Sequence, residues 1–79
     1  MTEFRAYEEF IDFIAAGPSS EHVATFQPSE ATRRRVVELV AREKATGLSA
    51  AESQELDDTM RLEHIMRLAK ARARRLLNP

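Results

Sequence analysis

The sequence predicts an all-α fold, in which a long antiparallel helical hairpin carries an aromatic N-terminal helix packed on it. The stretch from Ser49 to Leu77 contains neither Gly nor Pro and consists mainly of residues with high helix propensity. No segment alternates polar and apolar residues, and the dipeptides that favour hairpin turns are absent. Because the chain has only 79 residues, we expect residues 1–79 to form a single helical domain.

The first expected helix covers residues 2–16 and ends at Gly17-Pro18. Its apolar residues recur every three or four positions, which is the spacing of one helix face: Phe4, Tyr7, Ile11 and Ile14. Phe10 and Phe13 would flank this inward face. Every aromatic residue of the chain lies before Gln27, so we expect the first helix to plug a core that is otherwise aliphatic.

A short helical segment is expected over residues 19–26, with Val23 and Phe26 facing inward. The third helix is expected over residues 30–46, because Ser29 is a favourable N-cap and Gly47 a favourable end. Its apolar stripe would consist of Val36, Leu39 and Val40.

The fourth helix is expected over residues 50–77, where Ser49 and Glu52 have the spacing of a capping box. The short link after Gly47 predicts that the third and fourth helices are antiparallel neighbours. At about 1.5 Å per residue, the third helix would cover roughly 25 Å of a fourth helix that is roughly 40 Å long. The first helix or a second copy of the chain would then cover the remaining C-terminal turns.

Composition and charge exclude several classes of protein. The net charge of −1 argues against strong non-specific binding of nucleic acid by the whole domain. The lack of Cys excludes disulfides and thiolate metal sites. Neither a signal peptide nor an apolar run of transmembrane length is visible, so we expect a cytoplasmic protein with no membrane partner.

Residues that could support catalysis do not form a recognisable motif. His22 and His64 lie on different elements, and neither has a histidine or carboxylate four residues away, as a helical metal site would require. The acidic residues that open the fourth helix are expected to be solvated charges that suit the helix dipole: Glu52, Glu55, Asp57 and Asp58. The sequence therefore predicts no enzyme activity, no cofactor and no metal.

Two groups of residues remain as candidate binding sites. An apolar arc on the fourth helix is wider than one surface helix needs, which predicts packing against a partner protein or in a homo-oligomer. This arc consists of Leu62, Ile65, Met66, Leu68, Ala69, Ala73 and Leu76. A basic group could meet an acidic protein patch or a nucleic-acid backbone. It consists of Arg33, Arg34, Arg35, Arg67, Lys70, Arg72, Arg74 and Arg75.

Several runs of the sequence resemble a group of small all-helical bacterial proteins, common in cyanobacteria, whose genes often lie beside toxin-like or nuclease-like genes. The runs are Arg42-Glu43-Lys44, Gly47-Leu48-Ser49 with Glu52, Glu55-Leu56-Asp57, and the segment from Leu62 to Ala71. The resemblance covers about Phe10 to Leu77 and implies an antitoxin-like, partner-binding role. It implies no active-site residue.

The expected function is therefore that of a non-catalytic protein–protein interaction module that self-associates through its long C-terminal helix. An antitoxin-like partner of a neighbour-encoded protein is one form of this role. The alternative is a small nucleic-acid-binding or transcription-associated module that uses its basic helix faces.

Overall fold

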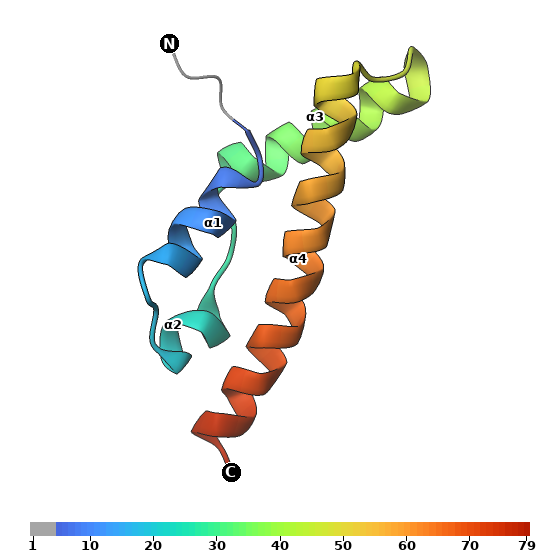
Figure 1. Cartoon of the computed structure of the whole chain (residues 1–79). Coiled ribbons are helices and arrows are strands. Elements are labelled where there is room, and N and C mark those ends of the chain that lie inside the picture. The colour runs from blue at the N-terminus through green and yellow to red at the C-terminus, as the bar shows by residue number, and fades with distance from the viewer. Residues whose placement is uncertain (1–4) are drawn as a thin grey trace.

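The computed structural model describes residues 5–79, and within these residues it contains four α-helices and no strand (Figure 1). The helices are α1 (Glu8–Ala15), α2 (Ser20–Thr25), α3 (Glu30–Ala45) and α4 (Ala50–Leu77). The predicted all-α class is confirmed. The molecule is elongated, with extents of 48 × 27 × 19 Å. A helix of 28 residues, such as α4, is about 42 Å long, so α4 sets the long dimension.

The helices are arranged around α4 (Figure 1). Its most extensive helix–helix contact is with α2, and its contact with α3 is much smaller. The sequence predicted that α3 packs along α4 as its antiparallel neighbour. In the structure, α2 packs along α4 instead. Two ion pairs join α3 to the first turns of α4, from Arg35 to Glu55 and from Arg42 to Glu52. These pairs therefore provide much of the connection between two helices whose direct contact is small.

The first helix begins later than the sequence predicted. Residues 2–4 of the expected helix lie outside the described residues, and Arg5 to Tyr7 form a turn before α1 rather than part of it. The Glu8 N–H closes this turn on the Arg5 carbonyl at 3.1 Å. The Ala6 N–H instead donates to the Glu55 carboxylate at 3.0 Å, which fixes the segment to α4.

The inward face of α1 also differs from the prediction. Phe10 is only 2% exposed, whereas Ile11 and Ile14 are 48% and 47% exposed. The ring of Phe10 lies 5.6 Å from that of Phe26, and the ring of Phe13 lies 4.3 Å from the same ring, both in tilted geometry. Tilted aromatic pairs at such separations add to the hydrophobic stabilisation. The rings of Phe10 and Phe13 therefore select the inward face, in place of the expected face that contains Ile11 and Ile14.

The capping box at the start of α4 forms as the sequence suggested. The Ser49 Oγ accepts from the Glu52 N–H at 3.1 Å, and the Glu52 carboxylate accepts from the Ser49 N–H at 3.1 Å. Gly47 has a φ of 88°, a left-handed conformation that ends α3 without a Cβ penalty. The conformation of the link between α3 and α4 is thus determined by Gly47 and by the capping hydrogen bonds between Ser49 and Glu52.

Replacing Ser49 by Ala should lower the free energy of unfolding by about 1 kcal/mol, because the Glu52 N–H then loses its acceptor. Denaturant unfolding followed by circular dichroism measures this loss. Ser53→Ala is the matched control, since Ser53 is exposed inside the same helix and Ala is the better helix former. Equal losses for both variants would contradict a capping role.

Candidate interaction surface

The predicted apolar arc of α4 divides into a buried part and an exposed part. Met66 and Ala73 are each 4% exposed, and Leu62 and Ala69 are half-buried. These residues follow a spacing of four, three and four, which is one face of a helix. This inward stripe belongs to the core and is not available to a partner.

The exposed part consists of Ile65, Leu68 and Leu76, which are 52%, 59% and 65% exposed. Their spacing of three and eight residues keeps them close to one line along the helix, because 3.6 residues make one turn. Arg61 and Arg72 lie on the same side of α4 and are also exposed. We refer to Ile65, Leu68 and Leu76 as the apolar row. A surface helix needs only one apolar stripe for its own core, so this second group is surplus to the fold.

The basic candidate residues fall into two groups, those that form a hydrogen bond or ion pair and those that form neither within the described residues. Arg35, Arg34 and Arg67 form ion pairs with Glu55, Glu30 and Glu63, and the Lys70 Nζ donates to the Phe26 carbonyl at 2.9 Å. The other four form no hydrogen bond or ion pair within residues 5–79: Arg33, Arg72, Arg74 and Arg75. Three of these four lie in the last turns of α4, and two of them, Arg72 and Arg75, lie on the side of the apolar row.

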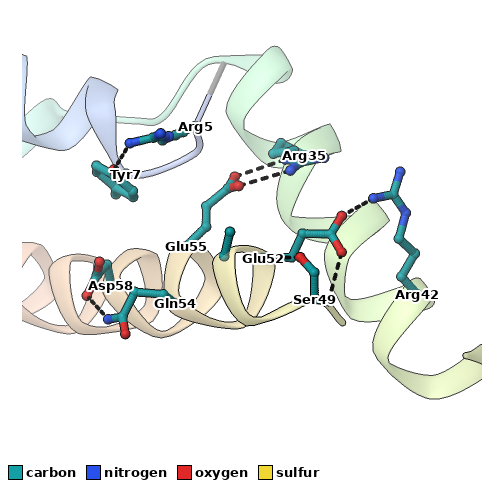
Figure 2. Close-up of a pocket in the computed structure, with 10 residues that line it drawn as sticks. Arg5, Tyr7, Arg35, Arg42, Ser49, Glu52, Gln54, Glu55 and Asp58 are labelled. Atoms are coloured by element: carbon teal, nitrogen blue, oxygen red, sulfur yellow. Dashed lines mark hydrogen bonds and ion pairs between the residues drawn. The ribbon is translucent and has the colours of Figure 1, made fainter. Parts of the chain in front are cut away.

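A partly buried ion pair joins the N-terminal segment, α3 and α4 (Figure 2). The Arg35 guanidinium binds both oxygens of the Glu55 carboxylate, at 2.9 Å each. Glu55 is only 6% exposed and also accepts from the Ala6 N–H. The network continues from Arg35 to Glu38, from Glu38 to Arg42, and from Arg42 to Glu52. Glu55 is therefore a structural residue, and its expected role as a solvated charge is wrong.

Their contacts lower the pKa of two of the three network carboxylates, Glu55 and Glu52. The hydrogen bond from Arg35 lowers the pKa of Glu55, with a smaller contribution from the Ala6 N–H, and these outweigh the effect of burial. The Ser49 N–H is the main cause of the lowered pKa of Glu52. The hydrogen bonds to Glu55 and its negative charge, with a smaller contribution from Glu38, raise the pKa of the Arg35 guanidinium. All three groups are thus held in their charged forms.

A cleft of about 710 Å³ lies beside this network, between the N-terminal segment and the start of α4 (Figure 2). Its polar side chains bond to one another: Glu55 to Arg35, Glu52 to Arg42, Asp58 to Gln54, and Tyr7 to Arg5. General acid–base catalysis needs a group that can exchange a proton near the working pH. The Glu52 and Glu55 carboxylates are bound to guanidinium groups, which hold them in their charged forms.

Between residues 5 and 79, no cluster of His, Asp or Glu could hold a metal ion. His22 and His64 are exposed and lie on α2 and α4. In the described part of the chain, no helix combines the length and the apolar character needed to cross a bilayer.

No protein-family model, curated protein or solved structure matches the chain. The apolar row and its basic neighbours therefore remain as the candidate site.

Proposed function

We propose that this chain is a non-catalytic interaction module that binds another protein molecule through the apolar row of α4. The observation that carries the proposal is the exposure of Ile65, Leu68 and Leu76 on a helix whose core stripe is separate. Full burial of one such side chain contributes about 1.5–3 kcal/mol. Each of the three still exposes at least half of its surface, so much of this free energy is available to a partner.

A protein partner suits this surface better than a nucleic acid does. Most contacts to nucleic acids go to phosphate oxygens, for which an apolar row provides nothing. Protein interfaces combine an apolar centre with a polar rim, and the row has Arg61 and Arg72 beside it. The resemblance to neighbour-encoded, antitoxin-like proteins makes the product of an adjacent gene the first heterologous partner to test.

The double variant Ile65→Ser, Leu68→Ser should lose partner binding by at least ten-fold, because it removes the centre of the row. In-cell cross-linking followed by mass spectrometry identifies the bound protein, including the chain itself, and titration of the purified pair measures the loss. Val37→Ser is the matched control, since Val37 is 68% exposed on α3 and lies away from the row.

Both variants should melt close to the parent protein, because exposed residues contribute little to the core. Partner binding that is equally strong in the parent and in the Ile65→Ser, Leu68→Ser variant would reject the row as the binding surface.

The second candidate function is nucleic-acid binding. It is favoured by one observation, the free arginines in the last turns of α4, Arg72, Arg74 and Arg75. Such binding would weaken steeply with salt, because each neutralised phosphate releases counterions. A duplex titration at two salt concentrations tests it: loss of binding in the Arg72→Gln, Arg75→Gln variant but not in the Ile65→Ser, Leu68→Ser variant would favour this function over the first.

A further inference from the structure

We propose that the occupant of the apolar row is a second copy of this chain, whose α4 lies antiparallel to the first. The inference rests on the proposed function and specifies its partner. Two properties of α4 carry it: the position of its charged residues along the helix, and the side of the helix on which the free charges lie.

The charges of α4 change sign at its middle. The half from residue 50 to 63 contains five acidic residues and one basic residue, whereas the half from 64 to 77 contains five basic residues and no acidic residue. Two parallel copies would therefore place like charges together. Two antiparallel copies would place the acidic half of each helix beside the basic half of the other. Only the antiparallel arrangement makes this surface complementary to itself.

The free charges also share a side of the helix with the apolar row. At 3.6 residues per turn, Asp57 and Arg75 are eighteen residues apart, which is five full turns, so they point in the same direction. Leu68 lies within about 20° of that direction by the same count. Asp57 and Arg75 are both exposed, and neither forms a hydrogen bond or ion pair within the described residues.

A two-fold axis that crosses α4 near Met66 brings these features together. Asp57 and Arg75 each lie nine residues from this point, about 13 Å along the helix. Asp57 of one copy would therefore meet Arg75 of the other, and this contact would occur twice. Ile65 and Leu68 lie near the axis and would pack against the same residues of the second copy. Arg61 shares this side, one turn after Asp57, at the i,i+4 spacing at which Asp57 can offset its charge.

The test uses two charge reversals, Asp57→Arg and Arg75→Asp. Each alone places like charges at both contacts of an antiparallel dimer. We expect each single variant to weaken dimerisation by at least ten-fold in sedimentation equilibrium. An equimolar mixture of the two variants should recover the affinity of the parent protein, because both contacts of the mixed dimer then join opposite charges. The doubly reversed chain should recover it as well.

An interaction between residues 57 and 75 of the same chain cannot explain the recovery of dimer affinity. Residues 57 and 75 lie about 27 Å apart on the same helix, well beyond the screening distance of about 8 Å at physiological ionic strength. A parallel dimer gives a different result, since each single reversal would exchange one like-charge contact for another and leave the affinity unchanged.

The antiparallel dimer is overturned if the parent protein sediments only as a 9.0 kDa species at hundreds of micromolar. It is also overturned if the mixture associates no better than the single variants. Failure of the proposed function is distinguishable from both results. A parent protein that stays monomeric but binds a different protein, with loss of binding in the Ile65→Ser, Leu68→Ser variant, rejects the dimer and retains the interaction module.

Discussion

Replacing Phe10 by Ala should lower the free energy of unfolding by about 3–5 kcal/mol. Phe10 is 2% exposed and its ring contacts that of Phe26, so the change removes a buried side chain and one of the two ring contacts between α1 and Phe26. A domain of this length has a total stability of about 4–12 kcal/mol. The variant should therefore lose a large fraction of its stability, which urea titration followed by circular dichroism would measure.

Ile14→Ala provides the control for this prediction on the same helix. Because Ile14 is 47% exposed, its truncation should cost only about 1 kcal/mol. The two variants distinguish the two possible inward faces of α1, since the sequence alone placed Ile14 on the inward face and Phe10 on its flank. If Ile14→Ala proved the more damaging change, the face of α1 described above would be wrong.

The all-α class could be predicted because helix signals are local. Ser29 and Ser49 cap α3 and α4 through their own side chains, and Gly47 supplies the left-handed residue between them. The inward face of α1 could not be predicted in the same way. Apolar residues surround most of this helix, so its pattern allows two faces, and the contact of Phe10 and Phe13 with Phe26 decides between them.

The separation between core and surface on α4 could have been found from the sequence by extending one stripe. The buried residues Met66 and Ala73 continue backward, at spacings of three and four, through Leu62 to Thr59 and Glu55. Thr59 is fully buried, and its hydroxyl donates to the Glu55 carbonyl at 2.7 Å. A carboxylate on an inward stripe predicts a buried partner. The identity of that partner depends on the position of α3, which no local pattern specifies.

Replacing Arg35 by Met should lower the free energy of unfolding by about 3–5 kcal/mol near neutral pH. The change leaves the Glu55 carboxylate buried without its paired cation, and the Ala6 N–H and the charge of Arg5 remain to stabilise the negative charge. Met retains much of the apolar stem of Arg35, so the loss reports the missing charge rather than a cavity. Arg34→Met is the control on the same helix, because Arg34 is exposed and pairs only with Glu30. Its cost should be about 0–1 kcal/mol.

The same variant should weaken the dependence of stability on pH that Glu55 contributes. In the parent protein the folded-state pKa of Glu55 lies below its ordinary value of 4.5. Its stabilisation is therefore complete above that value and is lost as the pH falls through the lower folded-state pKa. Without Arg35, the largest cause of the lowered pKa is removed while the burial remains, so the pKa of Glu55 should rise from its value in the parent protein. The folded variant would then bind a proton at a higher pH than the folded parent does, so acidification should cost the variant less stability than it costs the parent. Urea unfolding of parent and variant at several pH values between neutral and about pH 4 measures the difference. That difference should shrink steadily as the pH falls, and a constant difference across the range would show that Glu55 does not depend on Arg35 for its charge.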